Sequence, residues 1–302
     1  TFTYYVRMRS TSSIDFPATI WAPKEFLESS TKEYVGLGFY YGIVLVMVLY
    51  NLFLFFTLKD RNYLYYISII LAIGLFQFTF NGLGYQFLWG EYPLWNSKAI
   101  SFFITLMGLT LMNFARAFLD IVRLSKNTNR VMLFFQWFSG IAFVLVLLLP
   151  YRVILPFMTL LIGVSLLEVI ICIVAGVISF RRGFAPARFF LLAWAAFLIG
   201  MTAQAFRALG FLPNNFFTIY SAQIGSALEV VLLSIALADR INIMKSQITQ
   251  EKLEREQLKV VQEAEKKRII EKQKENLEKQ VEVRTAEVMQ QNHEIQAQRD
   301  RI

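Results

Sequence analysis

Seven long apolar stretches dominate the sequence, and they constrain the possible folds more than any other feature. Each is close to the ~20 residues that an α-helix needs to cross a hydrocarbon core of ~30 Å. The expected spans are 34–58, 63–89, 98–119, 131–150, 153–180, 184–209 and 216–238. Because lipid offers no partner for open backbone groups, we expect an all-α membrane protein with a seven-helix transmembrane bundle over 34–238.

The composition agrees with this expectation and excludes several chemistries. Hydrophobic residues make up 56% of the chain and charged residues only 17%, whereas soluble domains average ~25% charge. The chain has one cysteine, Cys172, and one histidine, His293. A disulfide framework within the chain and a Cys- or His-rich metal site are therefore excluded, and we expect no cofactor and no metal.

The formal net charge of +8 comes from the connections between spans. The last 64 residues, 239–302, hold 14 basic and 13 acidic groups and are nearly neutral, so nucleic-acid binding is not favoured. On one side of the expected membrane lie Lys59, Arg61, Arg123, Lys126, Arg130, Arg181, Arg182, Arg188, Arg240 and Lys245. The other side has Lys24, Lys32, Lys98, Arg152 and Arg207. The positive-inside rule then predicts an inner-membrane protein with its N-terminus outside and its C-terminus in the cytoplasm.

The first 33 residues differ from the spans that follow. Phe2, Tyr4, Val6 and Met8 alternate as in a strand, and prolines punctuate the rest of the segment. A segment this short cannot bury a core of its own. We interpret 1–33 as a short β remnant, the end of an extracellular β sensor domain or a stalk.

The C-terminal 64 residues are expected to continue the seventh span as a cytoplasmic helix. After Gly225 the sequence contains no glycine and no proline that would interrupt a helix. Heptad spacing predicts a parallel coiled coil, which a homodimer would complete. The expected seam consists of Ile241, Met244, Ile248, Leu253, Val260, Ile270, Leu277, Val281, Val288, Ile295 and Ile302. The alternative is a solvated single helix with pairs such as Glu275 and Lys279.

Polar side chains inside the expected spans are the candidate functional residues, because burying them in lipid is costly. Glu168 and Glu229 are expected at similar depth, near the middle of the fifth and seventh spans. The remaining candidates are Arg116, Asn51, Gln204, Arg207 and Gln223. Amides of this kind usually join helices. For the two carboxyl groups three readings stay open: they are protonated, they pair with an arginine, or they belong to a ligand or switch cavity. Arg207 could bind an anion or extend to the membrane surface.

No catalytic motif is present in this sequence. His293 precedes Glu294, as in a histidine-kinase phosphoacceptor box, but Gln296 and Ala297 replace the rest of that pattern. In the expected heptad, His293 falls on the outer face. The chain itself is not expected to be an enzyme.

Several segments resemble bacterial seven-transmembrane receptors with diverse intracellular signalling modules. Within the first span and the loop after it, the resemblance is carried by Gly42, Tyr50-Asn51-Leu52-Phe53 and Asp60-Arg61-Asn62-Tyr63-Leu64-Tyr65-Tyr66. Ser234-Ile235-Ala236-Leu237-Ala238-Asp239-Arg240-Ile241 is similar to the family's exit into its cytoplasmic helix. The stretch from Tyr4 to Trp21 resembles the final strands of its extracellular sensor domain.

The resemblance implies a receptor that couples an external ligand, suspected to be carbohydrate in some cases, to a cytoplasmic effector. Effectors of this family include histidine kinases, diguanylate cyclases, nucleotide cyclases and phosphatases, and no such module is expected within this chain. Two other readings remain open at this point. The chain could be a transporter or channel with an oligomerising helical tail, or a membrane scaffold that recruits partners.

Overall fold

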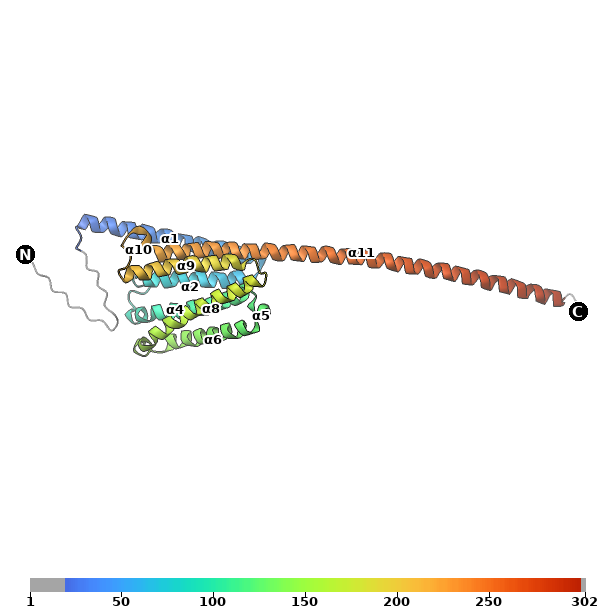
Figure 1. Cartoon of the computed structure of the whole chain (residues 1–302), viewed down its shortest axis with the longest axis horizontal. Helices are drawn as coiled ribbons and strands as arrows, with labels where there is room; N and C mark the ends of the chain where they lie inside the picture. The colour runs from blue at the N-terminus through green and yellow to red at the C-terminus, as the bar shows by residue number, and fades with distance from the viewer. Residues whose placement is uncertain (1–19, 300–302) are drawn as a thin grey trace, which may run out of the picture. The chain divides into compact units, whose positions relative to one another are not determined.

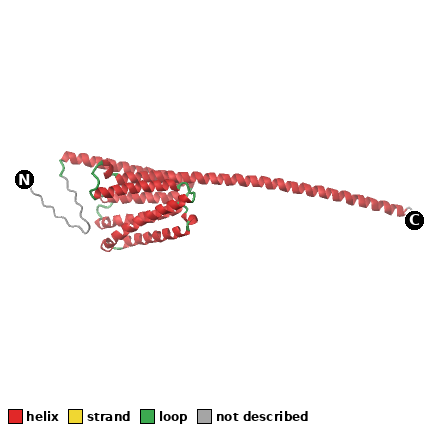
Figure 2. Cartoon of the chain, in the orientation of Figure 1, coloured by secondary structure: helices red, strands yellow, loops and turns green. Residues whose placement is uncertain are grey.

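The computed structural model describes residues 20–299, and the side chains of residues 20–291. This part of the chain is helical throughout, with loops but no strand (Figure 2). The predicted strand residues Phe2 to Met8 lie outside the described residues. The rest of the expected β segment has no strand where it is described, because a helix already begins at Pro23.

Within residues 20–299, seven helical segments are long and apolar enough to cross a membrane, which confirms the predicted number of spans. They are α1 (Pro23–Leu58), α2 (Arg61–Phe80), α4 (Pro93–Phe118), α6 (Lys126–Leu148), α7 to α8 (Tyr151–Arg181), α9 (Ala187–Ala208) and α11 (Ser221–Arg299). Short helices connect them: α3 (Leu83–Phe87), α5 (Ile121–Leu124) and α10 (Phe216–Ile219). Within the fifth span, α7 (Tyr151–Ile154) and the 3-10 turn η1 (Leu155–Phe157) precede α8 (Met158–Arg181). The chain is a multi-pass membrane protein.

Several helix limits differ from the predicted span limits, and three of these differences have a clear local reason. The helix that contains the first span begins at Pro23, before the predicted span start at residue 34, because proline is well suited to the first turn of a helix. The second ends at Phe80 instead of residue 89, because Gly82 takes a left-handed φ of 78°. The seventh begins at Ser221 instead of residue 216, because Asn215 and Thr218 form a capping box that starts the separate helix α10.

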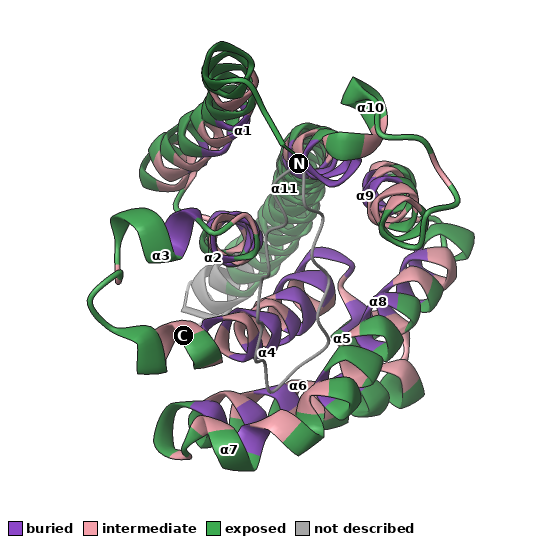
Figure 3. Ribbon diagram, turned by 90° about the vertical axis from the view of Figure 1, so that its left-hand side faces the viewer, coloured by how far each residue is buried: buried purple, intermediate pink, exposed green. Residues whose placement is uncertain are grey.

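The chain divides into two compact units, Thr1–Leu237 and Ala238–Ile302. In the first unit the long helices lie side by side (Figure 1). Helix α4 packs against α2, α6 and α8, while α1 packs on α2 and α9 packs on α8. Seen end-on, α4 is largely buried and α1 is largely exposed (Figure 3). The bundle therefore has its core around α4 and leaves much of α1 for the lipid.

Aromatic rings pack together in the part of this core near the end of α4. Tyr66, Phe114, Phe118, Phe190 and Trp194 are all fully buried. Their ring centroids lie 5.5 Å apart for Tyr66 and Phe114, and 5.8 Å apart for Phe118 and Phe190. This row joins α2, α4 and α9, so packing rather than hydrophobicity alone holds the helices in register in lipid.

The second unit, taken by itself, is helical as far as Arg299. Between Ile248 and Val288 the predicted seam residues are more than half exposed in this single chain. Ile241 is buried and Met244 is 38% exposed, while the side chain of Ile295 and all of Ile302 lie outside the described part. Glu275 and Lys279 form the expected pair, at 2.9 Å. The parallel coiled coil and the homodimer stay predictions.

Candidate functional site

The first turns of α11, residues 221–230, form polar contacts with two other helices. The hydroxyl of Tyr40, on α1, lies 2.9 Å from the hydroxyl oxygen of Ser226. The hydroxyl of Tyr66, on α2, donates a hydrogen bond to the backbone carbonyl of Val230. Both tyrosines are buried. We call these contacts, together with the α9 contact described next, the α11 socket.

A third helix, α9, approaches α11 at two glycines. A Cβ added at Gly200 would lie 3.0 Å from the Cα of Gly225 and would overlap the carbonyl oxygen of Ser221. Only residues without a side chain allow two backbones to come this close. By contrast, a Cβ at Gly38 or Gly42, the GxxxG pair of α1, meets nothing within 4 Å in the described structure.

Glu229 lies inside the α11 socket and is fully buried. Neither of its carboxylate oxygens has a hydrogen-bond partner among the described residues. The hydroxyls of Tyr40 and Tyr66 lie close enough to Glu229 for an electrostatic interaction. A polar group buried without a hydrogen bond costs free energy, so the protein carries a destabilising residue at the point where α11 meets its neighbours.

Gln223 lies at the beginning of α11 and connects it to α2 through a chain of amides. Its side-chain nitrogen donates to the side-chain oxygen of Asn81 at 3.4 Å, and the side-chain nitrogen of Asn81 donates to the hydroxyl of Tyr41 at 3.1 Å. The Gln223 carbonyl oxygen is buried without a partner in the described part of the chain. The structure thus brings two predicted site residues, Gln223 and Glu229, into the same socket.

Glu168 belongs to a different cluster, formed by α4, α6 and α8. It is 1% exposed and accepts a hydrogen bond from the hydroxyl of Ser139 on α6. On α4, a Cβ added at Gly108 would overlap the Glu168 carboxylate. The carboxyl group therefore fits into a space that a glycine leaves open, and a hydroxyl donor satisfies one of its oxygens.

Arg116 joins α4 to α6 without an acidic partner in its hydrogen bonds. Its guanidinium donates to the side-chain oxygen of Asn129 at 3.0 Å and to the side-chain oxygen of Gln136. The nitrogen of Gln136 in turn donates to Asn113 at 2.9 Å. These amides accept hydrogen bonds from the arginine, which is the structural role expected of amides between helices.

Three predicted site residues form their described hydrogen bonds away from both the Glu168 cluster and the α11 socket: Arg207, Gln204 and Asn51. Arg207 donates to Asn214 at 3.2 Å. When the side-chain amide of Gln204 is oriented so that its nitrogen donates and its oxygen accepts, the oxygen accepts a hydrogen bond from Arg207 at 3.3 Å. Asn51, fully buried on α1, donates at 2.8 Å to the carbonyl oxygen of Met47 in its own helix.

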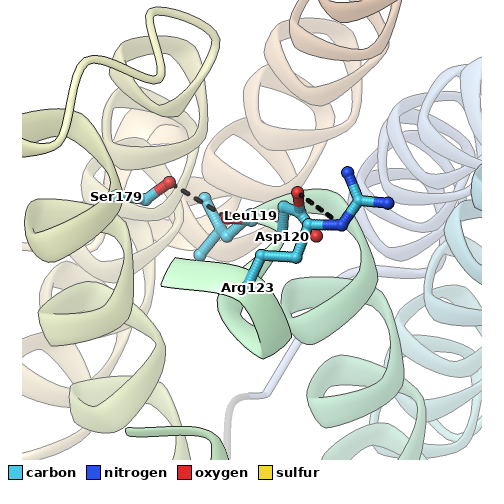
Figure 4. A network of polar contacts seen from close by, with 4 residues as sticks. All are labelled: Leu119, Asp120, Arg123 and Ser179. Carbon is cyan, nitrogen blue, oxygen red and sulfur yellow. Dashed lines mark hydrogen bonds and ion pairs between the residues drawn. The ribbon is translucent and has the colours of Figure 1, made fainter. Parts of the chain in front are cut away.

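A polar clamp lies where α4 ends (Figure 4). The hydroxyl of Ser179, on α8, donates to the carbonyl oxygen of Leu119 at 3.1 Å. Asp120 has a left-handed φ of 50° and pairs with Arg123 at 3.8 Å. The Ser179 hydrogen bond holds the turn between α4 and α5 against α8.

The sequence pattern does not single out Tyr40, Tyr66, Ser139 or Ser226, although these residues surround the two carboxyl groups. Hydroxyl side chains are common in transmembrane helices and cost little to bury, so they did not stand out among apolar residues. Tyr66 alone carried a usable signal, since it ends the Asp60-to-Tyr66 segment on which the family resemblance depends.

Comparison with known families gives one match, to the family described as 7TM diverse intracellular signalling, over residues 33–240. The matched region covers α1 from residue 33 onward, α2 to α10, and the part of α11 that contains the socket. It is a membrane sensory domain, and no catalytic domain is detected in the chain. No match was found among curated proteins or among solved structures. Because the match spans more than half of the sequence, the chain belongs to the 7TM diverse intracellular signalling family.

Proposed function

We propose that this chain is the transmembrane and linker part of a homodimeric receptor that relays an external signal through α11 to a cytoplasmic effector. The observation that carries the proposal is the length of α11. It is a single helix from Ser221 to Arg299, and its first turns contact α1, α2 and α9. A helix without a break transmits rotation or sliding better than a loop, because its backbone hydrogen bonds resist bending.

The α11 socket supports this role because its polar groups are incompletely satisfied in the described structure. Glu229 is buried without a hydrogen bond in the described structure, and the Gln223 contact is long at 3.4 Å. A ligand shifts a two-state equilibrium by its difference in affinity for the two states, which amounts to a few kcal/mol. An imperfect set of contacts is easier to shift by that amount than a fully satisfied one.

The apolar residues of the tail support a homodimer. Leu253, Val260, Val281 and Val288 recur at heptad spacing, and Leu277 occupies the complementary seam position. Each of the five is more than half exposed in one chain. A second copy in parallel would cover them as a coiled coil. Ion pairs of the Glu275–Lys279 type contribute only ~0.2 to 0.5 kcal/mol each and would not replace this burial.

Membership of the family supports coupling to an intracellular signalling module. In the proposed orientation, the N-terminus is outside and the C-terminus is in the cytoplasm of a bacterium, as the distribution of Lys and Arg predicts. Residues 1–33 would then join the bundle to an external ligand-binding part, and 239–302 would lead to the effector. A carbohydrate is the ligand class that the family resemblance suggests, and a kinase, a cyclase or a phosphatase is the effector class.

Disulfide cross-linking in the tail tests the relay without knowledge of the ligand. Cys172 is replaced by Ala, and a cysteine is placed at the seam position Leu277 or at the off-seam position Asn276. Gly200→Ala then takes the place of the unknown ligand as the perturbation, since its Cβ would overlap the Ser221 carbonyl oxygen. We expect cross-linking at 277 to exceed cross-linking at 276. Gly200→Ala should change the rate at 277 on the order of tenfold, as a bias of about 1.4 kcal/mol between two states produces.

Two control variants decide the interpretation. Gly38→Ala, whose Cβ meets nothing within 4 Å, should leave the rate unchanged. A Gly-Pro insertion after Arg240 breaks the helix and should abolish the effect of Gly200→Ala. If the effect survives the insertion, the tail acts as a scaffold and not as a relay. Equal cross-linking at 276 and 277 contradicts the predicted seam, and solute flux into proteoliposomes indicates a transporter.

A further inference from the structure

The turn between α1 and α2 is short and places two basic side chains close together. Helix α1 ends at Leu58 and α2 begins at Arg61. Lys59 has a left-handed φ of 54°, and its N–H bonds to the carbonyl oxygen of Phe55 at 2.7 Å. Glycine is the usual residue at such a helix end. A lysine there accepts backbone strain, a feature often associated with functional positions.

A hollow of about 400 Å³ opens beside this turn. It is lined by Phe55, Phe56, Lys59, Arg61, Leu64 and Tyr65. The two cations therefore share one concave surface with aromatic and aliphatic side chains. Phe56 is 66% exposed and Leu64 is 40% exposed, so the apolar part of this surface is open from the side of the bundle.

The positive charge in the hollow is not neutralised by the described part of the protein. Lys59 and Arg61 are exposed, and the side chains described for residues 20–291 offer neither of them a hydrogen bond or an ion pair. The acid between them, Asp60, does not line the hollow. One of its oxygens accepts from the backbone and side-chain nitrogens of Asn62 at 2.9 and 2.7 Å, and the other is buried.

Two arginines of the bundle have a different environment. Arg123 pairs with Asp120 (Figure 4), and the guanidinium of Arg116 donates hydrogen bonds to two side-chain amides. An arginine satisfied in this way needs no external anion. The pair Lys59 and Arg61 combines two free cations with a concave apolar wall, which matches a ligand that has a phosphate at one end and hydrocarbon at the other.

We propose that this hollow binds the headgroup phosphate of an anionic phospholipid. Both helices cross the membrane, so their ends lie at the depth of the lipid phosphates. Lys59 and Arg61 hold the phosphate through charge-assisted hydrogen bonds, and the acyl chains lie along Phe56 and Leu64. Tyr65 provides an amphipathic ring of the kind that prefers the membrane interface.

Lipid retention by the purified full chain tests this proposal. The protein in detergent is titrated with phosphatidylglycerol or phosphatidylcholine, and bound lipid is counted by native mass spectrometry. We expect the wild type to retain phosphatidylglycerol preferentially. The double variant Lys59→Gln, Arg61→Gln should lose roughly tenfold or more of that affinity, because it removes two cations at an anionic headgroup. The charge-conserving variant Lys59→Arg, Arg61→Lys should keep it.

The matched control is Arg181→Gln, Arg182→Gln, which removes two exposed cations at the end of α8. Because spans alternate in direction, α1 and α8 end on the same side of the membrane. Equal losses in both double variants would mean general charge attraction and would overturn the site. Displacement of the lipid by soluble glycerophosphoglycerol at equal concentration would indicate a free-phosphate site instead. Melting temperatures report folding, and if the double variant does not fold, Arg61→Gln alone is measured in the same way.

Discussion

Glu168 and Glu229 are both carboxylic acids buried in the helical bundle, but their surroundings differ. Glu168 accepts a hydrogen bond from Ser139 and fits against Gly108. Glu229 has no hydrogen-bond partner among the described residues and faces the hydroxyls of Tyr40 and Tyr66, which bond elsewhere. The difference teaches that equal burial does not imply an equal role. Glu168 is built into the packing of α4, α6 and α8, whereas Glu229 is a destabilising element at the α11 socket.

The largest effect is expected when the space around Glu168 is filled. Gly108→Leu would push the carboxylate away from Ser139, which adds overpacking to the loss of a buried hydrogen bond. We expect the free energy of unfolding to fall by about 3 kcal/mol, measured by unfolding in mixed detergent micelles. Gly163→Leu is the control, because a Cβ at Gly163 on α8 meets nothing within 4 Å. Similar losses in both variants would show that Glu168 does not depend on this space.

A smaller effect is expected when only the hydrogen-bond donor of Glu168 is removed. Ser139→Ala leaves the packing intact but deprives a buried carboxyl group of its partner. The free energy of unfolding should fall by about 2 kcal/mol, the cost of an unsatisfied buried polar group. Ser165→Ala serves as the control, since the exposed Ser165 hydroxyl bonds only to Ile162 in its own helix. An unchanged stability in Ser139→Ala would remove the distinction between the two carboxyl groups.

The helical architecture could be predicted from the sequence because crossing a membrane demands length and apolarity, and both are visible residue by residue. Helix ends were less predictable. Gly82 and the pair Asn215 and Thr218 decide two of them through backbone conformation and capping, which hydropathy does not register.

The partners of the candidate residues were not predictable from the same information. A helix that is apolar on every side can rotate about its axis without changing its hydropathy pattern. The sequence therefore placed Glu168 and Glu229 at similar depth but could not assign one to Ser139 and the other to the α11 socket. The same uncertainty affects the glycines. Gly38 and Gly42 have the spacing of a contact motif, yet the close approach occurs at Gly200 and Gly225, far apart in the sequence.

Replacing each carboxyl group with methionine is expected to have the smallest effect on the free energy of unfolding. Because the two replacements should change that free energy in opposite directions, they test the difference between Glu168 and Glu229 most sharply. Methionine is unbranched, similar in length to glutamate and apolar. Glu229→Met removes a buried group without a hydrogen bond, so the free energy of unfolding should rise by about 1 kcal/mol. Glu168→Met instead leaves the Ser139 hydroxyl without its acceptor and should lower the free energy of unfolding by a similar amount.

Both variants are measured in the same micelles as the others, together with cross-linking at Leu277→Cys. A relay that depends on an imperfect socket should respond less to Gly200→Ala once Glu229→Met has stabilised that socket, while Glu168→Met should leave the response intact. If both methionine variants shift stability in the same direction, Glu229 has a partner that satisfies it. The destabilised socket would then no longer explain how α11 is poised to move.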